Sequence, residues 1–280
     1  MSAAASALRR EHGFMFALTL PALLLFLLFF GYPVARLLSL SVSGFSGQWY
    51  AKALTDPLYL DVFIITAEIA LAVTVASLLI GYPVAYLLAT TTSGWRAFGF
   101  LVVMLPLWTS VLVRTYAWMV LLGRNGIVNR ALLALGAIEQ PLPLLYNLSG
   151  VLLGMTHVLL PYMVLPIYGS LRRIDPDLVR AAEGLGAPAW RVFFRIHLPV
   201  TLPGIAAGGV LVFVLALGFF ITPALLGGGK VMMIAVLIQQ QVGELLDWNF
   251  AAALSTLLTV ATVLAYALVQ GAIERRERDR

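Results

Sequence analysis

The sequence contains no cysteine among its 280 residues, which excludes disulfides, thiolate metal sites and a cysteine nucleophile. Histidine is rare, and the three present (His12, His157 and His197) are too scattered to have the spacing of a metal-binding cluster. Charged residues make up only 11% of the chain, whereas an ordinary soluble domain carries about 25%. The sequence therefore gives no basis for expecting thiol or metal chemistry, and it is unusually poor in charge.

Apolar residues are abundant instead, at 61% of the chain. Several apolar runs exceed the roughly 20 residues that a helix needs to cross a bilayer. A soluble core does not require runs of that length, so the composition indicates an integral membrane protein. The net charge of +5 does not point to nucleic acid, because the arginines lie beside the apolar runs, as is typical of membrane topology.

We predict an all-α integral membrane protein with a single domain, residues 1–280, and six transmembrane helices. The predicted spans are residues 14–40, 60–88, 97–123, 148–170, 202–226 and 250–273. The first follows Arg9 and Arg10, as in a signal sequence, but its apolar run is longer than the about 7–15 residues of a secretory signal. We therefore expect it to remain as an uncleaved helix.

The placement of positive charge predicts the orientation. With the N-terminus in the cytoplasm, twelve arginines lie on the cytoplasmic side and six arginines or lysines lie outside, which satisfies the positive-inside rule. Both termini are then cytoplasmic, and so is the segment 171–201 between the fourth and fifth spans. The two long outer connections are each predicted to hold a short helix, one near 128–135 and one, re-entrant or interfacial, within 227–250.

Residues 180–199, RAAEGLGAPAWRVFFRIHLP, concentrate charge, glycine and proline within this cytoplasmic segment. Asp175 followed by Pro176 is a typical helix start, and Gly186 can adopt the left-handed conformation that ends a helix. We predict a helix over about 176–185 and a second helix that begins at Pro188 and ends at Leu198 and Pro199. A simple positively charged anchor loop is the alternative interpretation.

The spacing of this segment resembles the EAA loop of permease subunits of binding-protein-dependent ABC importers, whose pattern is E-A-A-x3-G-x9-I-x-L-P. The matching positions are Ala181, Ala182, Gly186, Ile196, Leu198 and Pro199. Arg180 stands where the family has glutamate, and Glu183 follows three residues later. Residues 107–129, 160–182 and 246–255 further resemble permeases of the spermidine/putrescine type and their relatives for opines and amino-acid-like compounds.

The resemblance implies a type I ABC importer permease fold in the bacterial inner membrane. It implies partners as well: two ATPase subunits that dock on loop 171–201, a second and different permease subunit, a periplasmic solute-binding protein and the lipid bilayer. The chain itself would bind no cofactor, because ATP and magnesium belong to the ATPase subunits. The GGGK run at 227–230 is not a phosphate loop, since Ala224 and Val231 occupy positions where that motif needs Gly and Ser or Thr.

Two charged residues fall inside predicted spans, Glu68 in the second and Arg114 in the third. A charge at a helix centre costs about 2.5–3.5 kcal/mol on insertion scales, so such residues usually face a cavity or a partner. We predict that they line the translocation pathway, and they are candidates for a direct pair. Alternatively, Arg114 reaches the outer interface and Glu68 makes an inter-helix hydrogen bond.

The aromatic residues Trp108, Tyr116 and Phe220 are further pathway candidates, although aromatic residues near span ends are more often part of the interfacial belt. Gly204 and Gly208 form a small-xxx-small pattern that predicts close helix packing in the fifth span. Two other functions remain open from the residues alone. One is an ion-coupled secondary transporter that uses Glu68 as a proton site, and the other is a non-transporting membrane scaffold.

Overall fold

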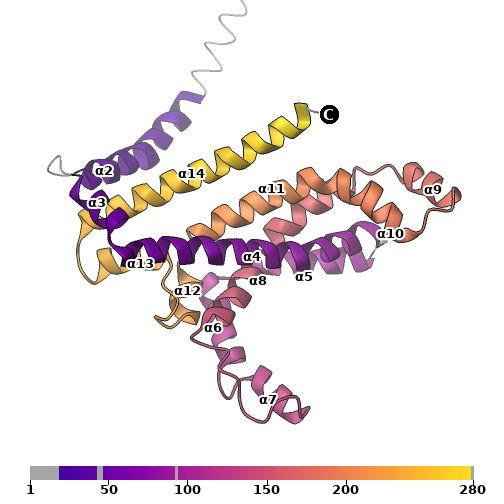
Figure 1. Cartoon of the computed structure of the whole chain (residues 1–280), viewed down its shortest axis with the longest axis horizontal. Coiled ribbons are helices and arrows are strands. Elements are labelled where there is room, and N and C mark those ends of the chain that lie inside the picture. Colours follow the sequence, from indigo (N-terminus) through magenta and orange to yellow (C-terminus); the bar gives the residue numbers. More distant parts are fainter. Residues whose placement is uncertain (1–18, 43–46, 92–93, 279–280) are drawn as a thin grey trace, which may run out of the picture.

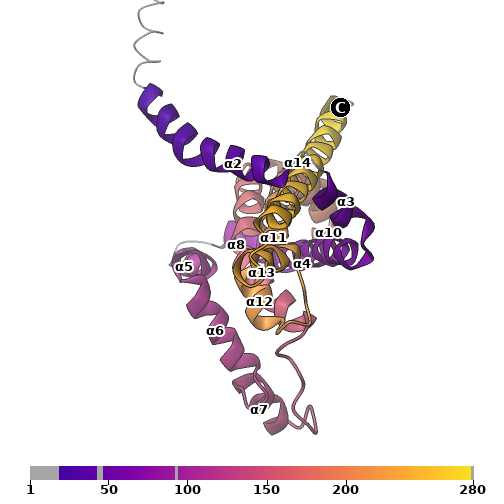
Figure 2. The same cartoon turned by 90° about the vertical axis from the view of Figure 1, so that its left-hand side faces the viewer.

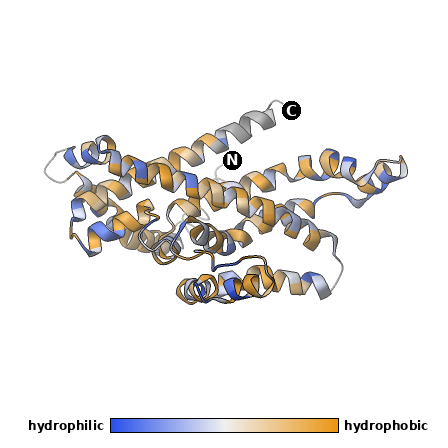
Figure 3. Cartoon of the chain, turned by 60° about the horizontal axis from the view of Figure 1, so that its bottom comes forward, coloured by the Kyte–Doolittle hydropathy of each residue, from blue (hydrophilic) through white to orange (hydrophobic). Residues whose placement is uncertain are grey.

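The computed structural model describes residues 19–42, 47–91 and 94–278, and all the regular secondary structure in those ranges is helical (Figure 1). Five of these helices are long and apolar enough to cross a membrane, and a bent pair of helices brings the number to six if the pair counts as one span. Hydrophobic residues run along the long helices and hydrophilic residues gather toward their ends (Figure 3). The predicted all-helical membrane fold is confirmed.

The N-terminal part of the chain contains one splayed helix and one very long helix. The first described helix runs over Thr19–Ser41 and includes a π-helical turn, η1 (Leu27–Gly31), followed by α2 (Tyr32–Ser41). After the short α3 (Gln48–Thr55) comes α4 (Pro57–Thr90), where the carboxylate of Asp56 accepts a hydrogen bond from the backbone N–H of Leu58 at 3.0 Å. The 34 residues of α4 give it a length of about 51 Å, well beyond the about 30 Å of the hydrocarbon core.

The region predicted as one span over 97–123 consists of two helices. They are α5 (Gly94–Trp108) and α6 (Val111–Leu122). The chain bends by 105° between Gly94–Trp108 and the helical stretch Val111–Ala134. Pro106 lacks the N–H that would continue the helical hydrogen bonds, which weakens the last turn of α5. A short α7 (Ile127–Ala134) follows where a helix near 128–135 is predicted, and α6 and α7 extend away from the main bundle (Figure 2).

The next five helices form two membrane-spanning helices and the 171–201 segment that joins them. They are α8 (Leu148–Leu171), α9 (Pro176–Gly184), α10 (Ala189–Val192), the π-helical η3 (Phe193–His197) and α11 (Leu198–Leu217). We call residues 176–197, from α9 to η3, the elbow. At the end of the molecule opposite the elbow lie α3 and α13, and α14 runs from there toward the elbow end (Figure 1).

The prediction that Leu198 and Pro199 end the second elbow helix is wrong, because the chain is helical without interruption over Ala189–Leu217. Proline cannot bond the carbonyl four residues earlier, and its ring crowds that carbonyl. For Pro199 this is the carbonyl of Arg195, which lies in the middle of the widened π turn. The same arrangement occurs at Pro33, whose fourth preceding residue, Phe29, is central in η1.

The last part of the chain contains a second broken span. The region predicted as 202–226 divides at residues 218–220 into α11 and the short α12 (Ile221–Leu226). Then come α13 (Ile234–Gly243) and α14 (Trp248–Arg278). The buried hydroxyl of Thr66 on α4 accepts a hydrogen bond from the backbone N–H of Ile234 at 2.8 Å, so the start of the predicted short outer helix is fixed to α4.

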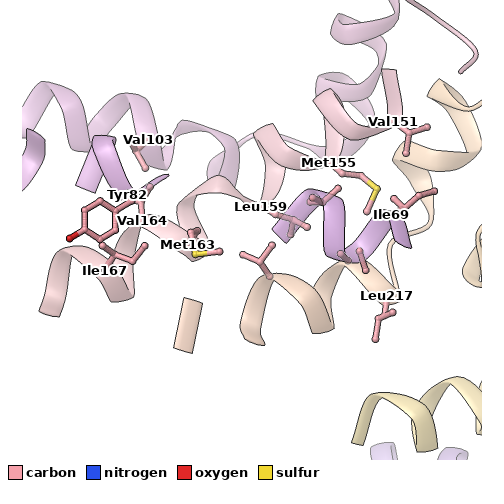
Figure 4. Close-up of a cluster of buried hydrophobic side chains, with 14 of the residues drawn as sticks. Ile69, Tyr82, Val103, Val151, Met155, Leu159, Met163, Val164, Ile167 and Leu217 are labelled. Carbon is pink, nitrogen blue, oxygen red and sulfur yellow. The ribbon is translucent and has the colours of Figure 1, made fainter. Parts of the chain in front are cut away.

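The core lies where α4, α8 and α11 pack together (Figure 4). Its largest fully buried side chains on α8 include Met155, Leu159 and Met163. On α11, a Cβ at Gly204 would lie 2.6 Å from the carbonyl oxygen of Pro166, and one at Gly208 would lie 3.2 Å from that of Met163. The predicted small-residue contact is confirmed, because a Cβ at Gly204 would overlap the α8 backbone and one at Gly208 would press against it.

We expect Gly204→Ala to destabilise the protein by about 1–3 kcal/mol, since the added methyl group overpacks a backbone contact. Gly209→Ala is the matched control, because a Cβ there meets only the methyl carbon of Thr74, at 3.9 Å. Thermal unfolding of the two purified variants beside the parent protein measures the effect. Equal melting temperatures for both variants would show that the close approach of α11 to α8 at Gly204 does not contribute to the stability of the protein.

Candidate functional site

The elbow is built by local backbone interactions of the kind that the sequence predicts. The carboxylate of Asp175 accepts a hydrogen bond from the N–H of Asp177 at 2.9 Å and caps the start of α9. At the other end, the N–H of Gly186 donates to the carbonyl of Glu183 and that of Ala187 to Ala182, at 2.9 and 3.1 Å. Gly186 has a φ of +79°, the left-handed conformation that this helix end requires.

The predicted coupling residues lie along both arms of the elbow and just beyond it. The exposed ones are Arg180, Ala181, Glu183 and Gly186, and the half-buried ones are Ala182, Ile196, Leu198 and Pro199. Arg180 forms an ion pair with Asp177, one turn earlier on α9, and the two side chains are 73% and 76% exposed. Such exposed pairs contribute little to stability. Arg180 therefore adds little to the stability of the fold and remains accessible at the surface.

The elbow also displays large apolar side chains. Leu185, next to Gly186, is 90% exposed, and Leu178, Trp190 and Phe194 are each more than half exposed. A solvated anchor loop gains nothing from exposing these groups to water, whereas exposed apolar side chains of this size are typical of interaction surfaces. This observation favours a docking surface over the anchor-loop interpretation.

Aromatic contacts attach the elbow to α4. The ring centroids of Tyr82 and Phe193 lie 5.5 Å apart, and those of Tyr86 and His197 lie 5.3 Å apart. The hydroxyls of Tyr82 and Thr201 are within hydrogen-bonding distance at 3.1 Å. Because η3 continues directly into α11, a displacement of the elbow acts on α11 and α4 together.

An open cavity of about 530 Å³ lies between the elbow and the ends of α4 and α8. Its wall includes Thr90 on α4, Arg172 after α8, and Arg180, Glu183 and His197 on the elbow. The elbow therefore does not lie flat on the helix bundle but leaves space beneath it. That space permits the elbow to move relative to α4 and α8.

A second region of interest lies at the two helix breaks. A guanidinium nitrogen of Arg114 donates to the carbonyl of Pro106 and lies 3.3 Å from the hydroxyl of Thr109, so Arg114 caps the broken end of α5. The hydroxyls of Thr115 on α6 and Thr222 on α12 lie 3.4 Å apart and bring the two breaks together. Broken membrane helices with irregular backbone occur where the backbone is buried in protein or lines a cavity.

Four predicted pathway residues lie at these breaks. Trp108 ends α5 and is 75% exposed, Arg114 is half-buried, Tyr116 is exposed on α6, and Phe220 is half-buried just before α12. Glu68 lies elsewhere, on the exposed side of α4. It does not pair with Arg114, because the one ion pair within the described residues joins Arg180 and Asp177.

Glu68 instead lines an open cavity of about 320 Å³ together with Lys230. The sequence gives no signal that Lys230 belongs to a site, since Lys230 lies far from Glu68 in the chain and is not part of a recognised motif. The sequence also gives no signal for Thr115, because a threonine in an apolar run does not reveal its partner. Within the described ranges, no three histidine, aspartate or glutamate side chains are placed to hold a metal ion.

Comparison with known proteins identifies the family. Residues 11–279 match the family model of the binding-protein-dependent transport system inner membrane component. The spermidine/putrescine transport system permease protein PotB of Escherichia coli K12 is 39% identical over 207 residues, covering 74% of this chain and 75% of that protein. The inner membrane ABC transporter permease protein YdcU of the same organism is 33% identical over 238 residues, covering 80% and 75%.

A solved structure shares the fold. In the crystal structure of a bacterial alginate ABC transporter in complex with an alginate pentasaccharide-bound periplasmic protein, one chain matches with a TM-score of 0.74 and 20% identity, covering 95% of this chain and 96% of that chain. The likeness extends over nearly the whole of both chains and confirms the fold of an ABC importer permease. This chain belongs to the permease components of binding-protein-dependent ABC importers, as a multi-pass protein of the bacterial inner membrane without an ATPase domain of its own.

Proposed function

We propose that this permease imports a small cationic solute of the polyamine type, which a periplasmic binding protein delivers. The observation that carries the proposal is the 39% identity to spermidine/putrescine permeases over three quarters of the chain. An opine or an amino-acid-like compound is the second candidate, and the presence of Arg114 near the helix breaks favours a carboxylate-bearing solute of that kind.

We further propose that the elbow docks on an ATPase subunit and that ATP and magnesium are bound there. Two such ATPases, one for each permease, and a second, different permease would complete the transporter. The exposed apolar side chains of Leu185, Trp190 and Phe194 support this role, because they need a partner surface. Docking of the elbow on a cytoplasmic ATPase requires loop 171–201 to lie on the cytoplasmic side, in agreement with the side that the distribution of arginine predicts.

The proposed mechanism is alternating access driven by the elbow. Closure of the ATPase pair displaces the elbow, and the uninterrupted helix Ala189–Leu217 carries the displacement to the break at 218–220. From there the contact between Thr222 and Thr115 reaches α6 and the break beside Arg114. A rigid helix between the elbow and the two breaks would convert movement at one membrane face into opening or closing at the pathway.

Two alternative functions lose their support once the family is known. An ion-coupled secondary transporter with Glu68 as a proton site is not a binding-protein-dependent importer component. A membrane scaffold does not account for a match that extends over residues 11–279 of a transport family. The charge on Glu68 therefore needs an explanation within an ATP-driven importer.

Replacing Gly186 with valine should uncouple the transporter, since a branched side chain in the left-handed conformation costs about 1–2 kcal/mol or more and distorts the elbow. We expect solute-stimulated ATPase activity of the complex to fall about five- to thirtyfold, because the strain reduces the population of the native elbow and each 1.4 kcal/mol corresponds to a factor of ten. Membrane insertion should be unaffected, because a Cβ at Gly186 meets no atom within 4 Å.

Gly136→Val is the matched control for this experiment. Gly136 follows α7 in the same leucine-glycine-alanine context, with a φ of +68° and no atom within 4 Å of an added Cβ. Both glycines end a helix with the same pair of backbone hydrogen bonds, so the backbone strain is equal and only the location differs. Equal losses of ATPase stimulation in both variants would refute a specific coupling role for the elbow.

The proposed substrate class is tested by uptake into liposomes that contain the complete complex. We expect accumulation of putrescine or spermidine only when ATP is inside and the binding protein is outside. The comparison set contains an opine and several amino acids at the same concentrations. Accumulation of these compounds without polyamine uptake would replace the polyamine assignment, and uptake without ATP would contradict the coupling mechanism.

A further inference from the structure

The cavity that contains Glu68 has the chemistry of a site for one end of an alkylamine. Its walls are formed by apolar side chains on α4 and α8, with Val231 from the turn after α12, and two charged groups, Glu68 and Lys230, complete the lining. The apolar lining residues are Ile65, Ile69, Ala72, Leu148, Leu152 and Val231. A cavity lined by apolar side chains and one carboxylate matches an ammonium group at the end of a methylene chain.

Glu68 is available to a ligand. Within the described residues it makes no hydrogen bond and no ion pair of 4.0 Å or less, although it lies on a membrane-spanning helix. An unpaired charge in this position is costly unless it faces water or receives a cation. Glu68 lies about 16 Å along α4 from its start at Pro57, which the arginine distribution places at the outer side. The cavity therefore lies in the outer half of the protein, where a solute released by the binding protein arrives.

The side chain of Lys230 has the same chemistry as one end of a polyamine, because it is an ammonium on four methylene groups. It follows a glycine turn in which Gly228 and Gly229 have φ values of +56° and +77°. The backbone N–H of Lys230 donates to the carbonyl of Gly227 at 3.1 Å, whereas its ammonium has no partner in the described part of the chain. The turn thus holds the lysine backbone in place and leaves its aminobutyl group free to enter or leave the cavity.

We propose that Glu68 binds one primary ammonium of the imported polyamine and that Lys230 competes for the same carboxylate as a tethered alkylammonium. The inference rests on the proposed polyamine substrate and adds the site where it first binds. The apolar walls cover the methylene groups of the solute while Glu68 pairs with its charge. When the solute leaves, Lys230 takes its place, which prevents the site from holding a cation so tightly that transport stops.

The experiment uses the absence of cysteine from this chain. Ala72 is exposed in the cavity wall, so Ala72→Cys introduces a single thiol into the permease subunit of the assembled complex. Labelling of this subunit by a small methanethiosulfonate reagent is measured at increasing putrescine concentration. We expect putrescine to protect the thiol, and E68Q to raise the half-protecting concentration about tenfold through loss of a charge-assisted hydrogen bond. K230M should lower that concentration, because the tethered competitor is removed.

Two variants serve as matched controls. Asp61→Asn removes an exposed carboxylate seven residues before Glu68 on α4, outside the cavity lining. Lys52→Met removes an ammonium that lies 4.3 Å from the ring centroid of Phe250, also outside the cavity. Neither should change protection by putrescine.

The outcomes separate the two proposals. Absence of polyamine uptake by the parent complex overturns the proposed substrate and this site with it. Normal polyamine uptake with protection that E68Q leaves unchanged overturns the site alone. If amino acids protect the thiol and K230M weakens that protection, Lys230 binds a carboxylate, and the site takes a zwitterion instead of a polyamine.

Discussion

The close contact between α8 and α11 is the interaction on which the rest of the structure depends. In a bilayer, apolar surface alone does not hold two helices together, because lipid tails are as apolar as the side chains. Gly204 and Gly208 instead allow the α11 backbone to approach the α8 carbonyls, and α4 packs against both helices. The same two helices flank the 171–201 segment, one at each end. The position of the elbow therefore depends on the buried α8–α11 contact, together with the aromatic contacts that attach η3 to α4.

Two prolines, Pro199 and Pro106, lie where the chain solves the same backbone problem in opposite ways. Near the elbow, the π turn η3 accommodates Pro199 and keeps the helix continuous through to Leu217. Near Pro106 no such turn forms, the chain bends by 105°, and Arg114 satisfies the carbonyl that the broken helix leaves without a partner. Backbone polar groups in a membrane must be satisfied within the protein, and the chain meets this requirement in different ways at Pro199 and at Pro106. At Pro199 the helix stays continuous and can transmit movement, whereas near Pro106 the helix breaks and the chain bends.

Sequence reasoning succeeded where structure is decided within a few neighbouring residues. The start of α9 at Asp175, its end at Gly186, the small-residue face of α11 and the apolar length of the spans all follow from local chemistry. It failed at Pro199 and at the break after Trp108, because a proline in an apolar run predicts a disturbance without saying whether the helix widens or breaks. It also could not place Glu68 beside Lys230, since only packing of α4 and α8 against the turn after α12 brings these side chains to one cavity.

Helix α4 carries both the contacts to the elbow and the proposed solute site. Tyr82 and Tyr86 contact η3 of the elbow, and Glu68 lies 14 residues before Tyr82, which is about 21 Å along a continuous helix. Coupling between two sites is reciprocal in free energy. If displacement of the elbow changes the affinity of Glu68 for an ammonium group by some factor, then an ammonium group at Glu68 must bias the elbow by the same factor. Solute stimulation of an ATPase that the solute never touches then requires only that α4 has two positions, each favoured by one of the two ligands.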